Sequence, residues 1–527
     1  MNQIRLIPSW VLLLLITIAQ DAFSQLHQPY RFEQVVKNSE EGFTVISLKK
    51  EGLALIRDMH KFAEGKKKWQ LEIVDTVLTK VWSTELELES RLILVGYEYN
   101  LRHLYLLFRE GESDYYNFRL LTVLFYEKEI QTNEIKFEVN FKMTHFTMAG
   151  SSAIFGGNVS NEPAVLLYSQ SSNHTKVLPG LFIRDISLLD VRTNQNQSFN
   201  VLLAERKGKE KKRLAVRTYD QDGNLLMDDV INIDGQFSVL TGLTSTLESD
   251  EMIIAGTYGD PNGKQALGYY SVVVDPFNEQ LVTYTDFSSL NHFLDYLTPR
   301  RADKIKAKTR KQKTLGRQPD YKAYVVPFRI EERPKGFYLL SELYYPSNSV
   351  NPYPYGSNYY NPNAYGYYPY GMSPFSTRYF NNYPYGYSTV RNTDVRMVQT
   401  MVTELDLHGK PGKDVTLKLN EIKQSSLEQV GDFVILRDSI CIVYKKEEDI
   451  FYQKESGDPD EKPSIKQTKV RLQKENDVLK NENEFESQVR FWYGHHFYVW
   501  GYQTIKDTSL EGDQTRHVFY VNRFSME

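Results

Sequence analysis

The chain has 527 residues, of which 41% are hydrophobic and 25% are charged, and its formal net charge is −4. This composition excludes a wholly disordered or collagen-like chain, and the weak charge gives no global attraction to nucleic acid or to an anionic membrane. The unusual features are 37 tyrosines, 13% aromatic residues and a single cysteine. We therefore predict a globular protein that binds no nucleic acid.

Residues 1–24 have the pattern of a secretory signal peptide. Arg5 precedes an apolar core from Trp10 to Ala19, and the small residues Ala22 and Ser24 precede a cleavage site after Ser24. An uncleaved signal anchor is the less favoured alternative, because the apolar run is shorter than the roughly 20 residues of a membrane span. No later stretch is apolar enough to cross a membrane as a helix. We expect an exported protein, in the periplasm or on the outer cell surface, with no transmembrane span after cleavage.

The single cysteine, Cys441, lies in an apolar run that is typical of a β-strand. It has no cysteine partner within the chain, and no histidine or basic residue beside it lowers its pKa. We predict a structural core thiol, in a fold that is stable without disulfides.

Short apolar runs of strand-forming residues recur along the chain, and turn-forming residues separate them. Early runs are about 50 to 60 residues apart, and the two insertions described below account for the wider gaps. The recurring runs are Phe43–Ile46, Leu92–Tyr97, Ala153–Gly157, Val201–Glu205, Met252–Gly259, Phe337–Glu342, Phe433–Leu436 and Phe497–Tyr502.

This repeat predicts an all-β fold, a β-propeller of about seven blades with four strands each. Residues 25–527 would form one propeller-like domain, and the strand Val518–Asn522 would share a blade with the N-terminal strand to close the ring. Tandem β-sandwich domains are the alternative architecture. Asp220–Asn224 and Asp406–Lys410 share the form Asp-x-x-Gly-polar, which predicts hairpin turns.

The first insertion covers residues 288–317. Its first part, Ser288–Leu297, has helical periodicity, and Pro299 is predicted to end that helix. A basic linker follows from Arg300 to Arg317, with nine Lys or Arg and one acidic residue. A solvated helix or linker is the favoured interpretation over a surface for an anionic partner. A second helix is predicted near Leu53–Glu64.

The second insertion, residues 344–387, is a low-complexity segment with 14 tyrosines in 44 residues and a single charge, Arg378. Proline and glycine at this density disfavour regular structure, so a disordered loop is one interpretation. The other is a binding surface, because tyrosine offers a flat apolar face and a hydroxyl at low entropic cost. The candidate binding residues are Tyr353, Tyr355, Tyr359, Tyr360, Tyr365, Tyr367, Tyr368, Tyr370, Tyr383, Tyr385 and Tyr387.

These features together resemble a group of uncharacterised exported proteins of Bacteroidota. The resemblance is carried by the signal peptide, the strand Ile254–Gly259, the basic stretch after Leu297, and the run Leu339–Pro346 that leads into tyrosine-rich sequence. It covers residues 200–420. It implies a location in the cell envelope and no particular chemistry.

No catalytic, cofactor or metal motif stands out among the residues. The ten histidines form no zinc-binding spacing, and His495 and His496 would point to opposite faces of a strand. The Asp220 turn departs from a calcium loop at Leu225 and Ile231. No nucleophile elbow or phosphate-binding loop occurs. We predict no cofactor, no metal site and no catalytic residue.

Three functions fit these observations. The favoured one is a non-catalytic binding or scaffold protein of the cell envelope, which contacts a protein or glycan through propeller loops and the tyrosine-rich tract. The second is an exported propeller hydrolase or lyase with a site in the central channel. The third is a structural envelope component that self-associates through the tract.

Overall fold

In the computed structural model, the described residues form strands throughout, one α-helix and two short 3₁₀-helices. It describes residues 25–37, 42–111, 116–160, 162–179, 186–205, 212–246, 251–261, 263–275, 280–346, 395–424, 427–436, 439–455, 464–483, 487–509 and 514–526. The predicted signal peptide lies outside these ranges. No helix within them has the length and apolar character needed to cross a membrane.

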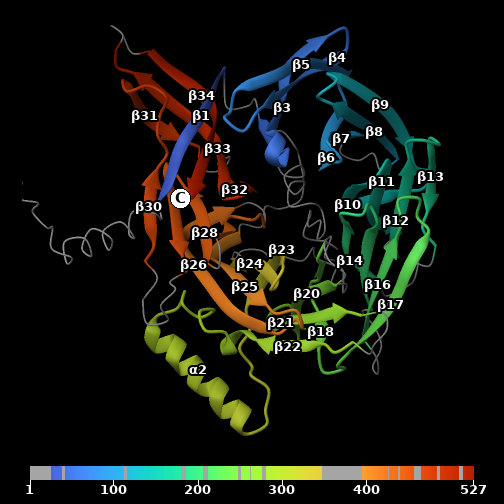
Figure 1. Cartoon of the computed structure of the whole chain (residues 1–527), viewed down its shortest axis with the longest axis vertical. Helices are drawn as coiled ribbons and strands as arrows, with labels where there is room; N and C mark the ends of the chain where they lie inside the picture. Colours follow the sequence, from blue (N-terminus) through green and yellow to red (C-terminus); the bar gives the residue numbers. More distant parts are fainter. Residues whose placement is uncertain are drawn as a thin grey trace, which may run out of the picture.

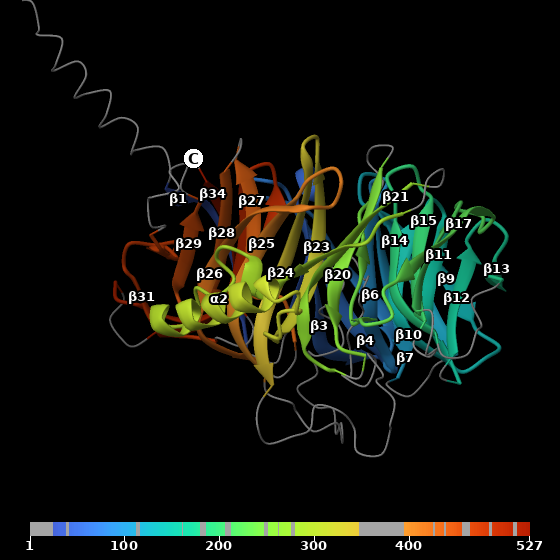
Figure 2. The ribbon, with the colours of Figure 1, turned by 90° about the horizontal axis from the view of Figure 1, so that it is seen from below.

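The strands form eight antiparallel sheets, which stand around one central axis as the blades of a β-propeller (Figure 1). The all-β propeller is confirmed, whereas the prediction of about seven blades was too low. Each recurring run of the sequence lies in a different blade. With the blades numbered 1 to 8 in chain order, the runs in blades 1, 2 and 7 are the strands nearest the axis. The other five runs are the second strands from the axis, so the spacing of the runs along the sequence is uneven. Figure 2 shows the same ring from its side.

We number the blades 1 to 8 in chain order and name the strands of each from the axis outward. The inner strands are β2 (Phe43–Ser47), β6 (Leu92–Asn100), β10 (Phe141–Ala149), β14 (Ile186–Thr193), β18 (Ser238–Val239) with β19 (Leu243–Thr244), β23 (Tyr324–Arg333), β27 (Asp432–Leu436), and β32 (Gln488–Tyr493) with β31 (Asp477–Glu482). The second strands are β3 (Leu53–Ala63), β7 (His103–Glu110), β11 (Ser152–Val159), β15 (Phe199–Glu205), β20 (Met252–Gly259), β24 (Gly336–Pro346), β28 (Ser439–Lys446) and β33 (His496–Asp507).

The outer half of each blade completes the sheet. The third strands are β4 (Lys66–Val74), β8 (Asn117–Leu124), β12 (Glu162–Ser169), β16 (Lys212–Tyr219), β21 (Ala266–Val274), β25 (Val395–Leu405), β29 (Asp449–Lys454) and β34 (Gln514–Met526). The outer strands are β5 (Lys80–Glu89), β9 (Glu129–Lys136), β13 (His174–Val177), β17 (Leu225–Ile233), β22 (Thr283–Asp286), β26 (Pro411–Gln424), β30 (Lys466–Lys469) and β1 (Leu26–Val36).

The core lies between neighbouring blades, because each sheet buries both of its faces. All eight residues of β20 are buried, which explains why this strand reads as a continuous apolar run. One core cluster joins blade 1 to blade 2 through Trp69 and Phe108, whose rings meet edge to face at 5.3 Å. Burial of side chains of this size contributes about 2 to 3 kcal/mol each.

The ring closes where β1 pairs with β34, so the first described strand completes the last blade (Figure 1). The predicted sharing of a blade by the N-terminal strand and Val518–Asn522 is confirmed. Leu26 packs into the core between blades 7 and 8, and Val36 packs into the core between blades 8 and 1. Strand β1 therefore connects both of its neighbours.

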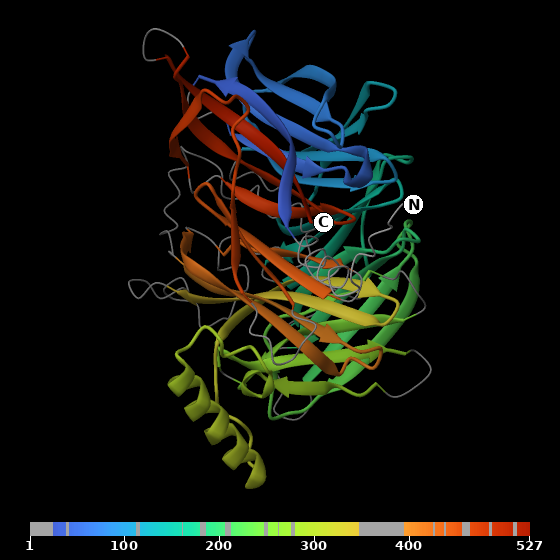
Figure 3. The same cartoon turned by 60° about the vertical axis from the view of Figure 1, so that its left-hand side comes forward.

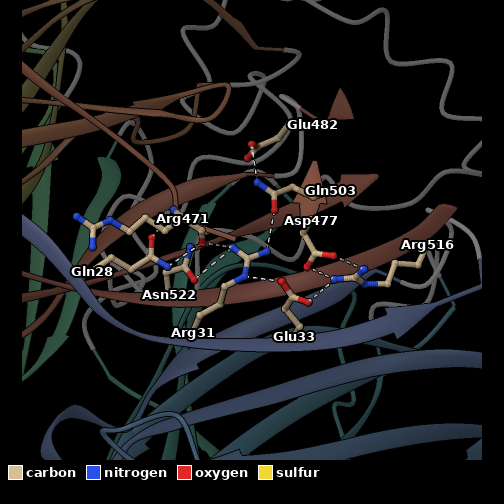
Figure 4. A network of polar contacts seen from close by, with 9 residues as sticks. All are labelled: Gln28, Arg31, Glu33, Arg471, Asp477, Glu482, Gln503, Arg516 and Asn522. Atoms are coloured by element: carbon tan, nitrogen blue, oxygen red, sulfur yellow. Dashed lines mark hydrogen bonds and ion pairs between the residues drawn. The ribbon is translucent and has the colours of Figure 1, made fainter. Parts of the chain in front are cut away.

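A polar network holds the closing strand in place (Figure 4). Arg31 on β1 pairs with Glu33 at 2.6 Å, donates to Gln503 on β33 at 2.7 Å, and lies 4.5 Å above the ring of Tyr520 on β34. Glu33 also faces Arg516 at 3.5 Å. The network thus spans three strands of one sheet.

The helix prediction for residues 288–297 was wrong. This segment begins with the 3₁₀-helix η3 (Phe287–Ser289), and its apolar residues fill the space between blades 5 and 6. The α-helix is α2 (Pro299–Thr314), within the stretch predicted as a basic linker. Proline fits the first helical turn, whose N–H groups have no partner inside the helix, so Pro299 starts the helix instead of ending it.

The second predicted helix, near Leu53–Glu64, is the strand β3, which follows the 3₁₀-helix η2 (Lys49–Glu51). Burial in the blade determines the structure of this segment more than its local pattern does. The two predicted hairpin turns are present. In each, the aspartate accepts hydrogen bonds from residues two and four positions on, and the glycine has a positive φ, +74° at Gly223 and +77° at Gly409.

Replacement of Arg31 by alanine tests the closing network. Loss of the guanidinium removes the 2.6 Å ion pair of Glu33 and the donor to Gln503 Oε1, and Glu33 keeps only the longer contact with Arg516, so we expect the free energy of unfolding to fall by about 2 kcal/mol. Val35→Thr on the same strand, where the residue is 66% exposed, is the control and should change stability by less than about 0.5 kcal/mol. Equal effects in urea unfolding would show that the network does not hold β1.

Candidate functional site

The eleven tyrosines predicted to bind a ligand lie outside the described residues. Of the tract 344–387, the structure describes Tyr344, Tyr345 and Pro346, at the end of β24. Residue 395 begins β25, and Pro346 pairs directly with Val395. Residues 347–394 therefore connect the second and third strands of blade 6 at a point where these strands are already paired.

The hydroxyl groups of three tyrosines form a ladder beside this point, and we call Tyr345, Tyr296 and Tyr321 the tyrosine ladder. The Tyr345 hydroxyl donates to that of Tyr296 at 3.5 Å, and Tyr296 is hydrogen-bonded to Tyr321. Tyr296 precedes α2 and Tyr321 follows it. Burial raises the pKa of Tyr296 and of Tyr321, so both hydroxyls stay neutral at physiological pH.

Further aromatic and cationic groups surround the start of the insertion. The rings of Tyr344 and Tyr324 are 5.6 Å apart across the β23–β24 pair. Arg396 on β25 is exposed and lies 5.6 Å above the ring of Tyr345. Half-buried aromatic faces with a cation beside them are a setting in which sugars and protein partners bind.

Two chain connections, one between β24 and β25 and one between β22 and β23, leave their strands from the same face of the ring. In an antiparallel blade, the connection between the second and third strands leaves from the same face as the connection to the next blade. The tyrosine-rich insertion is the first kind and the α2 segment is the second. Figures 1 and 3 show α2 on the outside of the ring.

A second group of polar and titratable side chains lies on the inner strands of blades 2, 3 and 4, and we call Glu98, His145, Asp190 and Arg192 the axial cluster. The register shifts by one residue in β10 just before His145 and in β14 just before Asp190. Such bulges change the direction of side chains and are frequent next to functional sites.

The axial cluster contains buried polar atoms with no hydrogen-bond partner among the described residues, namely Glu98 Oε2, His145 Nε2 and Asp190 Oδ1. The other oxygen of Asp190 accepts from the backbone N–H of Thr244 at 2.7 Å and lies 3.5 Å from Arg192 Nε. The side chain of Asp190 thereby links blade 4 to blade 5.

Burial shifts the pKa values of all three titratable groups of the cluster. It raises the pKa of Glu98 to about 7, against the smaller opposing effects of Lys49 and Arg192. Burial, with a smaller contribution from Arg192, lowers the pKa of His145 to about 3, and burial raises that of Asp190. A glutamate with a pKa near neutrality can exchange a proton at physiological pH, which is a property of general acids and bases.

Other buried charges hold the ring together. Glu342 on β24 accepts from the backbone N–H groups of Val430 and Gly431, at 3.0 and 2.7 Å, and so joins blades 6 and 7. Asp432 on β27 pairs with Arg329 of blade 6 at 2.9 Å and accepts from the backbone N–H of Phe491 in blade 8 at 2.8 Å.

Cys441 and His496, for which the sequence predicts neither a reactive thiol nor a metal ligand, both lie in packed positions within the blades. Cys441 is buried in the core, and burial raises the pKa of its thiol to about 12. His496 contacts Ser525 at 2.9 Å and Arg523 at 2.8 Å in blade 8. Within the described part of the chain, no three His, Cys, Asp or Glu side chains form a group that could hold a metal ion.

The axial cluster was not predicted from the sequence, although a signal for it exists. Asp190 interrupts the apolar run Leu188-Leu189-Asp190-Val191, and His145 lies directly before Phe146 in a strand of mixed apolar and polar residues. A charged or titratable residue in a strand with both faces buried needs a specific partner or function.

The chain matches no family model, and it matches no curated protein. Among solved structures, the Dos1 propeller matches 83% of this chain and 93% of its own chain, with 12% identity and a TM-score of 0.37. The polysaccharide lyase Uly1 matches 95% of this chain and 100% of its own, with 9% identity and a TM-score of 0.39. A prolyl endopeptidase matches 90% of this chain at 9% identity with a TM-score of 0.37. This chain spans 54% of that protein's length. Matches at this level carry no functional argument.

The pKa of Glu98 predicts a pH dependence of stability. Between its ordinary value of 4.5 and about 7, the folded state holds a proton that the unfolded state has lost, so stability should fall as pH rises through this range. Glu98→Gln keeps the size and removes the charge. We expect the variant to match the wild type near pH 4.5 and to exceed it by about 1 to 3 kcal/mol above pH 7. Parallel stability curves in urea unfolding from pH 4.5 to 8 would contradict this assignment.

Proposed function

We propose that the protein is a non-catalytic binding or scaffold protein of the cell envelope, exported by the signal peptide at residues 1–24. It recognises a protein or a glycan through its propeller loops and its tyrosine-rich insertion. The observation that carries this proposal is the origin of the insertion. A paired double strand, β24 and β25, presents a segment of 48 residues that begins beside the tyrosine ladder.

The surroundings of the insertion support contact with a partner. Blade 6 is complete below the insertion, because β25 pairs with β26 as far as Val395 and Gln424. The segment is therefore not needed to fill a gap in the sheet. Tyrosine rings stack on sugar rings and on apolar protein surfaces, and their hydroxyls provide hydrogen bonds at the edges.

Deletion of residues 347–394 tests this function. Because Pro346 and Val395 are directly paired, an Asn-Gly turn can join them. We expect the thermal midpoint to stay within about 2 °C, because blade 6 keeps its strands and core. Binding is measured on a glycan array and by crosslinking to envelope proteins. We expect the intact chain to bind a glycan or a protein in these assays and the deletion variant not to bind it. Binding that survives in the variant, or a variant that fails to fold, would contradict the proposal.

The axial cluster favours one alternative, an exported propeller hydrolase or lyase with a central site. The observation behind it is the buried oxygen of Glu98 that has no hydrogen-bond partner in the described part of the chain, in a carboxyl group whose pKa burial raises to about 7. Turnover of a polysaccharide or peptide by the intact chain, with at least a hundredfold loss of rate in Glu98→Gln, would establish this alternative. Turnover that is unchanged in this variant, or absent from a broad panel, would reject it.

A further inference from the structure

Helix α2 has one face attached to the ring. Thr309 is buried, and its hydroxyl donates to Ser288 Oγ at 2.7 Å. Lys313 pairs with Asp286 at 2.8 Å, and Lys306 donates to the backbone carbonyl of Asn291 at 2.8 Å. These contacts fix the orientation of the helix, so its opposite face is held toward solvent.

The opposite face is a basic stripe, which we define as Arg300, Lys304, Lys308 and Lys311. These residues follow one another at intervals of four, four and three, so they lie on one side of the helix, over a length of about 16 Å. All four are exposed. Asp303, the one acidic residue of the helix, lies roughly a quarter turn away.

Few acidic side chains neutralise the positive charge of the basic stripe. Lys308 pairs with Asp320 at 2.6 Å, and both side chains are more than half exposed, so this pair is weak and exchangeable. Within the described residues, Arg300, Lys304 and Lys311 have no acidic partner. The helix N-terminus adds partial positive charge next to Arg300 and Arg301, where an acidic residue would be more favourable.

The first turn of the stripe lies near the tyrosine ladder. Ala302 and Ile305 of α2 pack against the same apolar cluster as Tyr321 and Tyr345. Tyr321 is joined through Tyr296 to Tyr345, where the tyrosine-rich insertion begins. The half-buried rings of Tyr321 and Tyr345 thus lie beside the attached side of α2, and the basic stripe lies on the side turned to solvent. The two sets of groups border one surface around the helix.

We propose that this surface binds a linear acidic polysaccharide, whose carboxylate or sulfate groups pair with the basic stripe while its sugar rings stack on tyrosine. This inference deepens the proposed binding function and rests on it. A row of cations along a rigid helix fits a ligand with regularly repeated anionic groups. The aromatic rings beside it favour a polymer of sugars over an anion that offers charge alone.

A membrane surface fits less well. The outward face of α2 has no large apolar side chain to insert, and Leu315, which is 57% exposed, lies beyond the end of the helix. Nucleic acid offers the same repeated negative charge, and it is less favoured because we expect the chain to be exported. Both remain measurable outcomes of the experiment.

The test uses the full mature chain with Arg300, Lys304 and Lys311 each changed to glutamate. The control triple variant, Lys61→Glu, Lys142→Glu and Lys418→Glu, has the same change in net charge at exposed strand positions in other places. Titration calorimetry with heparin, polygalacturonate and neutral dextran measures the affinity at about 50 and 200 mM salt. Anionic vesicles and duplex DNA are the competing probes.

We expect heparin or polygalacturonate to bind the intact chain, with an affinity that falls at the higher salt concentration, and dextran not to bind. The α2 triple variant should lose at least about tenfold in affinity, and the control variant less than about twofold. Equal losses in the two variants would overturn the inference, as would binding of DNA or vesicles in preference to both polysaccharides. Binding that withstands the α2 variant and is lost on deletion of residues 347–394 overturns this inference and leaves the proposed function standing. The reverse pattern overturns the role of the insertion and supports the basic stripe.

Discussion

Nine residue pairs join β1 to β34, and the closed ring depends on them. Each blade needs a neighbour on both faces, because the apolar side chains of its strands point both ways. Blade 8 can cover blades 7 and 1 only when strands from both ends of the chain are present in it. The contacts of Arg31 with Glu33, Gln503 and Tyr520 therefore stabilise more than one sheet. They help to fix the last blade against which the first and the seventh are packed.

Buried charges perform a related task elsewhere in the ring. Asp190, Glu342 and Asp432 each reach from one blade to a backbone N–H of a later one. A carboxylate that accepts from backbone donors fixes the position of a neighbouring strand with directional bonds, which apolar packing alone does not provide. Asp190 also keeps one buried oxygen, Oδ1, without a partner among the described residues, as do Glu98 and His145 with one atom each. Asp190 therefore belongs both to the contacts between blades and to the axial cluster.

Much of the fold could be predicted from the sequence, because the strand repeat is dictated by burial. Each apolar run marks one blade, and the Asp-x-x-Gly turns at Asp220 and Asp406 follow from local chemistry. The eight marked runs correspond to the eight blades, so the predicted number of about seven was one lower than the runs themselves indicate. Pro299 was misread because proline is equally suited to ending one helix and starting the next. The axial cluster was missed because Glu98, His145 and Asp190 lie on the inner strands of three different blades, at intervals of about 45 positions in the sequence.

The candidate surface was predicted only in part. The tyrosine composition drew attention to residues 344–387, whereas the connection to α2 depends on Tyr296 and Tyr321, which stand outside that tract. The Tyr296 hydroxyl contacts those of Tyr345 and Tyr321, and these contacts arise from the packing of blade 5 against blade 6. No local pattern relates a tyrosine before the helix, another after it and a third at the end of a strand.

The direct pairing of Pro346 with Val395 has a consequence for how this protein can change over time. The two strands meet whatever their connection contains, and the entropic cost of closing a chain segment rises only by about 0.6 kcal/mol for each doubling of its length. Blade 6 can therefore accept a longer, shorter or unrelated connection at little expense in stability. In evolution, and equally in the laboratory, this position is an insertion site that can accept new recognition segments without changes to the rest of the ring.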